Sequence, residues 1–87
     1  MKTVFKYPLT ITDLQLFNLP AGATFLHAGP DPYGDICLWA AVDTNEPIEP
    51  VKIRVVGTGN AMPDSEQLEF IGTVLDRMYV WHVFKVL

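Results

Sequence analysis

An 87-residue chain with six basic and ten acidic residues carries a net charge of −4. This charge argues against DNA or RNA as the main ligand, because a phosphate backbone is bound through clustered Lys and Arg. A chain this short builds one domain with one modest core, and its hydrophobic fraction of 49% is more than such a core easily hides, so we expect self-association or a partner surface.

Alternation of apolar and polar residues with a period of two predicts β-strands along the whole chain. Turn residues separate these strands: Pro8, then Pro20 with Gly22, then the loop GPDPYGD and the polar stretch DTNEPIEP at 43–50. A second glycine-containing loop, GTGNAMPDSEQ, follows the fifth predicted strand. The seven predicted strands are residues 3–7, 13–19, 23–28, 36–42, 51–56, 68–75 and 78–87.

The apolar run ICLWAAV at 36–42 predicts a buried central strand, and it holds the single cysteine, Cys37, as a small buried residue. A lone cysteine excludes an intramolecular disulfide. The short connection at Asp76 and Arg77 predicts an antiparallel hairpin, and one short helical turn at most is expected, near residues 64–67. We therefore predict an all-β protein of six to seven strands in a single domain, 1–87, folded as a small antiparallel β-barrel or a strongly curled sheet.

Residues with catalytic or metal-binding chemistry do not form a recognisable site in the sequence. The segment GTGN at 57–60 follows a strand as a phosphate-binding loop does, but Pro63 stands where a helix should begin, so a glycine turn explains it better. His27 and His82 lie on different predicted strands without identifiable co-ligands, and Ser65 lacks a nucleophile-elbow motif. We predict no catalytic residue, no metal site and no cofactor, and interpret His82 as a core or interface residue whose ring nitrogens are satisfied by neighbours.

The last predicted strand is apolar on both faces. Val80, His82, Phe84 and Val86 share one face, and the other is formed by Tyr79, Trp81, Val83, Lys85 and Leu87. Such a strand is either central in a sheet or covered by another chain. We select Tyr79, Trp81, Val83 and Lys85 as the candidate protein interface and expect a homodimer with two-fold symmetry.

Several short segments resemble a family of small uncharacterised proteins, a domain of unknown function, from tailed bacteriophages and prophages. These segments are KYPL (6–9), ITD (11–13), LPAGA (19–23), CLWA (37–40), VD (42–43), GTG (57–59), FIGT (70–73) and WHVF (81–84). They span nearly the whole chain in the same order. The resemblance assigns no catalytic residue, and it implies a phage origin and a role inside an infected bacterium.

Three functions follow as hypotheses from these observations. The leading one is a non-enzymatic protein-binding module that inhibits a bacterial host protein, such as a component of a defence system, by analogy with other small phage proteins. The second is a small structural or assembly component of the virion, and the third is a barrel that binds or sequesters a nucleotide or another small ligand. Because the chain shows no apolar signal segment and no long apolar stretch, we expect no membrane insertion and a location in the cytoplasm of the host.

Overall fold

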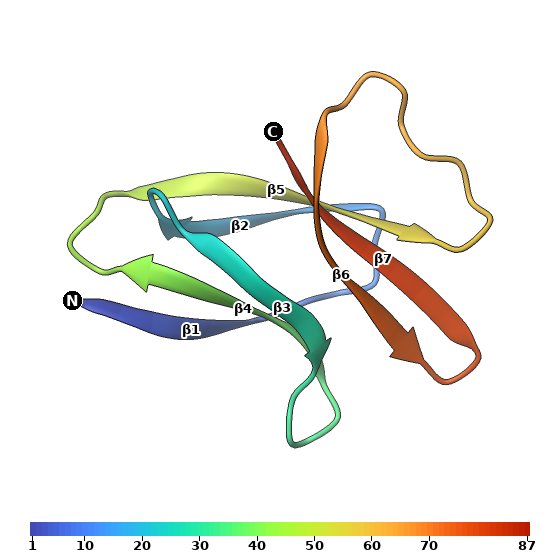
Figure 1. The fold of residues 1–87 in the computed structure, drawn as a ribbon, viewed down its shortest axis with the longest axis horizontal. Helices are drawn as coiled ribbons and strands as arrows, with labels where there is room; N and C mark the ends of the chain where they lie inside the picture. Colours follow the sequence, from blue (N-terminus) through green and yellow to red (C-terminus); the bar gives the residue numbers. More distant parts are fainter.

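The computed structural model describes all residues from Met1 to Leu87, and every regular element in it is a β-strand (Figure 1). The seven strands are β1 (Lys2–Pro8), β2 (Leu14–Pro20), β3 (Thr24–Pro30), β4 (Ile36–Asp43), β5 (Ile48–Gly57), β6 (Leu68–Asp76) and β7 (Tyr79–Val86). They match the seven predicted segments in number and order. The all-β prediction is therefore confirmed, and no helix crosses or covers the sheets.

The strands form two antiparallel sheets rather than one closed barrel. The first sheet has the order β1-β4-β3, and the second has the order β2-β5-β7-β6. The chain passes from the first sheet to the second between β1 and β2. Each of these strands is the outer strand of its sheet, and the two do not pair with each other. The predicted barrel is therefore wrong. A closed barrel needs hydrogen-bonded pairing between β1 and β2 and between β3 and β6, and neither pair of strands is hydrogen-bonded.

At the other seam, the edge strands β3 and β6 pack against each other without forming a ladder. Both strands carry an irregularity there, between Phe25 and His27 in β3 and between Phe70 and Gly72 in β6. Gly72 allows the approach, because a Cβ at this position would lie 3.3 Å from the backbone nitrogen of Ala28. The bulges bend the two edges toward one another and the glycine lets the backbones meet.

A thin apolar core fills the space between the sheets. The first sheet contributes Leu38, Ala40, Val42 and Ala28, and the second contributes Leu19, Val51, Ile53, Val55, Val74 and Val83. Full burial of a Val, Leu or Ile side chain stabilises the fold by roughly 1.5–3 kcal/mol. Only 17 of the 87 residues are buried, so many large apolar side chains remain at the surface, as the 49% hydrophobic content predicted.

Two predicted boundaries differ from the structure. Strand β5 begins at Ile48, within the predicted loop 43–50, and its Pro50 lies opposite Asn18 of β2. Proline is tolerated there because its nitrogen faces the side of β7, and β7 begins to pair with β5 only at Ile53. Residues 64–67 form a turn and no helix. The predicted hairpin between β6 and β7 is confirmed, and Arg77 in its turn has a φ of 60°.

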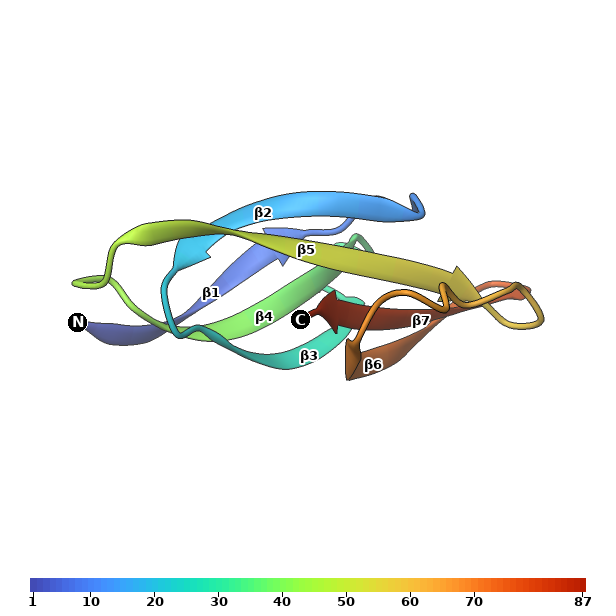
Figure 2. The ribbon, with the colours of Figure 1, turned by 90° about the horizontal axis from the view of Figure 1, so that it is seen from above.

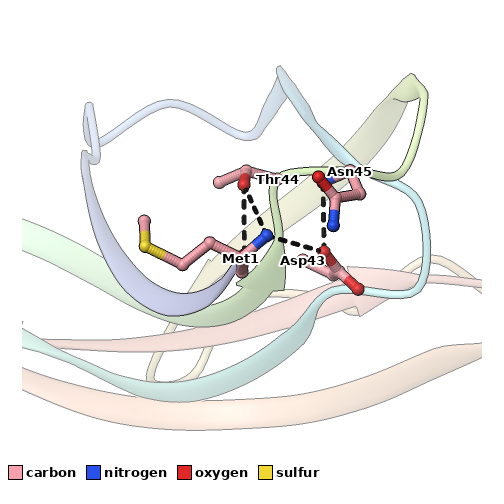
Figure 3. A network of polar contacts seen from close by, with 4 residues as sticks. All are labelled: Met1, Asp43, Thr44 and Asn45. Atoms are coloured by element: carbon pink, nitrogen blue, oxygen red, sulfur yellow. Dashed lines mark hydrogen bonds and ion pairs between the residues drawn. The ribbon is translucent and has the colours of Figure 1, made fainter.

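The first residue is held by polar contacts to the turn between β4 and β5 (Figure 3). The amino group of Met1 donates to Thr44 Oγ1 at 3.1 Å and pairs with Asp43 Oδ1 at 3.4 Å. Asp43 Oδ1 also accepts a hydrogen bond from the backbone nitrogen of Asn45, which holds the pKa of this carboxyl below its ordinary value. This network fixes the start of β1 beside the end of β4, next to a shallow depression of about 190 Å³ that Asp43 helps to line.

No helix of the structure has the length and apolar character needed to cross a bilayer.

Candidate functional site

The largest concave surface lies at the end of β5, between residues 9–13 and the loop 58–67. We call it the β5 groove. It has a volume of about 660 Å³ and is lined on its apolar side by Ile11, Met62 and Trp81, and on its polar side by Asp13 and Asn60. Gly57 forms part of its wall, because a Cβ there would lie 3.0 Å from Cζ3 of Trp81. The glycine therefore allows the indole ring to lie directly on the strand.

A second depression of about 500 Å³ lies beside the first, at the tip of the β6–β7 hairpin. We call it the hairpin depression. Thr58, Met78 and Tyr79 line it, and Trp81 belongs to both concave surfaces. The rings of Tyr79 and Trp81 stack with centroids 5.7 Å apart and planes inclined by 18°. The two depressions thus form one surface whose centre is an aromatic pair, a residue type enriched at binding interfaces.

The β5 groove contains a short piece of strand with one open edge. The pairing of β2 with β5 ends at Leu14 and Arg54, so residues 55–57 of β5 pair with β7 on one side and have no strand on the side of β2. Val55 still donates to the carbonyl oxygen of Asp13 at 3.1 Å, and the carbonyl oxygen of Gly57 accepts from Asn60, so the open edge consists of the Val55 carbonyl and the Gly57 N–H. An open strand edge offers backbone donors and acceptors to an extended segment of another chain.

One ion pair holds the loop 58–67 in place above the sheet. Arg54 Nε and one terminal nitrogen donate to the two carboxylate oxygens of Glu66 at 2.9 and 2.7 Å. The hydrogen bonds from Arg54 hold the pKa of Glu66 below its ordinary value, and the same contact raises the pKa of Arg54. This bidentate geometry fixes the loop and also neutralises Arg54, so Asp13 is the charged side chain of the groove that is left without a charged partner.

His82 lies outside the groove, on the opposite face of β7, beneath the same loop. Its Nε2 is 2.8 Å from Thr58 Oγ1 and its Nδ1 is 3.1 Å from Thr73 Oγ1. The expectation that both ring nitrogens are satisfied locally is confirmed. A hydroxyl–imidazole pair resembles part of a catalytic triad, but the third member here is a neutral hydroxyl and not a carboxylate that could stabilise a charged imidazolium. The arrangement pins the loop to the sheet.

The predicted interface residues are divided by the structure. Tyr79 is 56% exposed, and Trp81 and Lys85 are half-buried, whereas Val83 is fully buried in the core between the sheets. Val83 therefore packs inside the protein. Of the predicted interface residues, only Tyr79, Trp81 and Lys85 remain accessible to solvent. The Trp81 Nε1 atom is enclosed and has no hydrogen-bond partner, a costly arrangement for a buried donor.

A second polar cluster lies in the loop between β3 and β4, beside the end of β1. Asp31 accepts from Lys6 Nζ at 2.9 Å and from the backbone nitrogens of Tyr33 and Asp35, both at 2.9 Å. The hydrogen bond from Lys6 contributes most to holding the pKa of Asp31 below its ordinary value. Cys37 is buried next to this cluster, and burial raises the pKa of its thiol, which makes it a poor nucleophile. These contacts close the loop 31–35 and build no site.

No group of three or more His, Cys, Asp or Glu side chains is arranged to hold a metal ion. The segment GTGN forms a turn in which Asn60 donates to the carbonyl oxygen of Gly57 and Gly59 has a φ of 88°, as the glycine-turn interpretation predicted.

The sequence interpretation missed several residues of the groove, among them Ile11, Asp13, Asn60 and Met62. Ile11, Asn60 and Met62 lie outside the predicted strands and Asp13 begins the predicted strand 13–19, and these segments, far apart in the sequence, meet only after β2 and β5 pair. The signal that could have found them is the length of the loop 57–67, because loops of this length in small domains are often functional.

A comparison with protein-family models matches residues 1–87, the whole chain, to a domain of unknown function (DUF7352). The chain therefore belongs to the DUF7352 family. Comparisons with curated proteins and with solved structures found no match. The family assignment agrees with the resemblance to a domain of unknown function, and it carries no information on source or activity.

Proposed function

We propose that this protein is a non-enzymatic protein-binding module whose binding surface is the β5 groove together with the hairpin depression. The observation that carries the proposal is the open end of β5 beside the stacked Tyr79 and Trp81. An extended segment of a partner would add to the strand edge through its backbone and place an apolar side chain against Trp81. Such aromatic anchors in concave surfaces supply most of the energy of many interfaces.

The charge of the surface defines the chemistry of the partner further. Arg54 is neutralised by Glu66, which leaves the carboxylate of Asp13 as the charge of the groove, in a protein of net charge −4. The matching segment is apolar and carries a basic side chain, because opposite charges across an interface speed association and exclude wrong partners.

We further propose, from the resemblance to proteins of tailed bacteriophages and prophages, that the partner is a protein of a bacterial host. Inhibition of a host defence component in the cytoplasm of the infected cell is the role that this origin favours. This part of the proposal rests on analogy with other small phage proteins and not on the groove.

Two matched pairs of variants test the binding surface. A tagged chain is used to capture partners from the host, and the affinity of the purified partner is then measured for each variant. We expect Tyr79→Ala to weaken binding at least tenfold and Tyr33→Ala, which removes an exposed tyrosine from the distant loop 31–35, to leave it unchanged. Equal affinities for these two variants would exclude the hairpin depression from the interface.

Two charge-reversal variants test the contribution of the Asp13 carboxylate to binding. Asp13→Lys reverses the charge in the groove, whereas Asp35→Lys reverses it in the distant loop. We expect the first variant alone to bind more weakly, and more so at low salt, because screening reduces the effect. If both variants bind as well as the wild type, the partner segment does not carry the proposed basic residue.

A small ligand is a second candidate for the same groove, because its volume of about 660 Å³ lies within the size range of small-molecule sites. Thermal unfolding in the presence of nucleotides and metal ions tests this function. A ligand that raises the melting temperature of the wild type and not of Asp13→Lys would support it, and a flat response throughout would eliminate it.

A further inference from the structure

The two sheets present two strand edges to solvent, and the edges differ in what they allow. β1 is the outer strand of the three-stranded sheet and β2 is the outer strand of the four-stranded sheet. Figure 2 shows β2 along the upper margin of the molecule with no element beyond it. The remaining two edges, β3 and β6, face each other and are covered. A free strand edge can pair with another chain unless its sequence prevents this.

The edge of β1 is protected against pairing. Met1 accepts from Thr44 and Leu9 donates to Ile36, so the odd residues direct their backbone groups toward β4 and the even ones direct them outward. An antiparallel pairing of two β1 strands centred on Val4 would place Lys2 directly opposite Lys6 in both halves. A pairing centred on Lys6 would place Val4 opposite Pro8, which has no N–H to donate.

The edge of β2 is less protected, since its one proline, Pro20, lies at the end of the strand. Asp13 accepts from Val55 and Ala21 donates to Pro47, so the outward-directed backbone groups are those of the even residues, Leu14, Leu16 and Asn18. All three have an N–H group, and no residue from Leu14 to Pro20 is charged. Two of the side chains are apolar and exposed, Leu14 at 42% and Leu16 at 63%.

This edge is complementary to itself. When two β2 strands run antiparallel about a two-fold axis at Leu16, Leu16 lies opposite Leu16 of the second copy, and Leu14 lies opposite Asn18 of the second copy. Each of these opposed pairs can exchange two backbone hydrogen bonds, which gives about six in total. The two leucines at the axis and the flanking Leu14 residues lose exposed apolar surface on the same face.

We propose that two copies of this chain associate through their β2 strands, antiparallel and centred on Leu16, so that the two four-stranded sheets become one continuous sheet. The register places Pro20 of the second copy opposite Thr12, which lines the β5 groove. The dimer therefore extends the rim of the groove and leaves the stacked Tyr79 and Trp81 open. This homodimer uses a different surface from the one predicted on the last strand, and its test needs no partner protein.

Sedimentation over a concentration series tests the proposal. We expect the wild type to approach about twice the chain mass of 9.7 kDa with rising concentration. Leu16→Lys places two positive charges opposite each other and should weaken the dimer at least tenfold. Val4→Lys, a substitution of an exposed residue on the β1 edge, should leave the dimer unchanged. A wild type that stays at one chain mass, or a dimer that Leu16→Lys does not weaken, would overturn the proposal.

Cross-linking tests the register. Leu16→Cys places two thiols opposite each other across the axis at a Cα separation of about 5.5 Å, within the range of a disulfide. We expect mild oxidation to link Leu16→Cys chains and to leave Leu14→Cys chains single, because Leu14 faces Asn18 of the second copy. The native Cys37 is buried and provides no background. Equal cross-linking of both variants would contradict the register centred on Leu16. Cross-linking of Leu14→Cys alone would show that the two strands pair in a different register, centred on Leu14.

Discussion

The two sheets share one core but differ on the outside. Leu38 of the three-stranded sheet and Leu19 of the four-stranded sheet are both fully buried. On the outer faces, β1 carries Lys2 and Lys6, whereas the register of the second sheet aligns Leu14, Arg54, Phe84 and Phe70 in one row across its four strands. Three of the four residues in this row are apolar, and Leu14 and Phe70 among them are exposed.

The loops tied to the sheets differ in the same way. Asp31, with its side chain 4% exposed, takes three donors and closes the short loop 31–35 completely. Glu66 is 20% exposed and holds the ten-residue loop 58–67 through a single partner, beside the largest groove. One sheet thus ends in a short closed turn and the other in a longer loop beside the groove.

The largest effect is expected from the core. Leu38→Ala and Leu19→Ala, one from each sheet, should each lower the free energy of unfolding by about 2–5 kcal/mol, because each removes a fully buried side chain and leaves a cavity. Leu16→Ala, on the exposed face of β2, is the control and should change it by less than about 0.5 kcal/mol in the dilute monomer. Urea denaturation measures all three. A large difference between the two buried variants would mean that the sheets do not share one core.

A smaller effect is expected at the seam between the sheets. Gly72→Ala introduces a Cβ 3.3 Å from both the nitrogen and the Cβ of Ala28, and the strands β3 and β6 must move apart to accept it. We expect a loss of about 1–3 kcal/mol, as for other overpacked positions. Adding Ala28→Gly should restore part of this loss, since it removes the Cβ contact and not the backbone contact. An unchanged free energy of unfolding in Gly72→Ala would show that β3 and β6 are not closely packed at this position.

The two ion pairs should differ in their contribution to stability. Asp31→Asn weakens the contact with Lys6 in a buried setting, whereas Glu66→Gln weakens a partly exposed pair with Arg54. We expect Asp31→Asn to lower the urea midpoint more, because its site is less accessible to water. Limited proteolysis should show the opposite order of local effects, with faster cleavage of the loop 58–67 in Glu66→Gln. A larger change of the urea midpoint in Glu66→Gln would mean that the Arg54–Glu66 pair, and not the Lys6–Asp31 pair, contributes more to stability.

The smallest effect is a dependence on acid. The pKa values of Asp31 and Glu66 lie below their ordinary values of 3.8 and 4.5, so both contribute stability that is fully present above these values. This stability is lost as the pH falls through the lowered pKa values in the folded protein. Wild-type stability should therefore decline below about pH 4.5, and the decline should be shallower in Asp31→Asn and in Glu66→Gln than in the wild type. Parallel pH profiles for all three proteins would contradict this account.

Much of the fold was predictable because strand periodicity and turn residues are local signals. The run ICLWAAV predicted the central strand β4 with Cys37 buried, and the short connection at Arg77 predicted the β6–β7 hairpin. The candidate site was predictable only in part. Tyr79 and Trp81 were chosen from the alternation within one strand, but the same alternation included Val83, which the second sheet covers completely.

The groove and the open architecture depend on contacts that the sequence pattern does not encode. Asp13 and Asn60 are 47 positions apart and line one groove because β2 stops pairing with β5 at Arg54. Closure of a barrel likewise depends on whether distant edges meet, and here only β3 and β6 do so, at Gly72. The sequence by itself determined the strands, their turns and the excess of apolar residues, since these follow from neighbours along the chain. The tertiary structure alone decided which apolar residues are buried, which edges stay free and where the groove forms, because these follow from how strands pair across the chain.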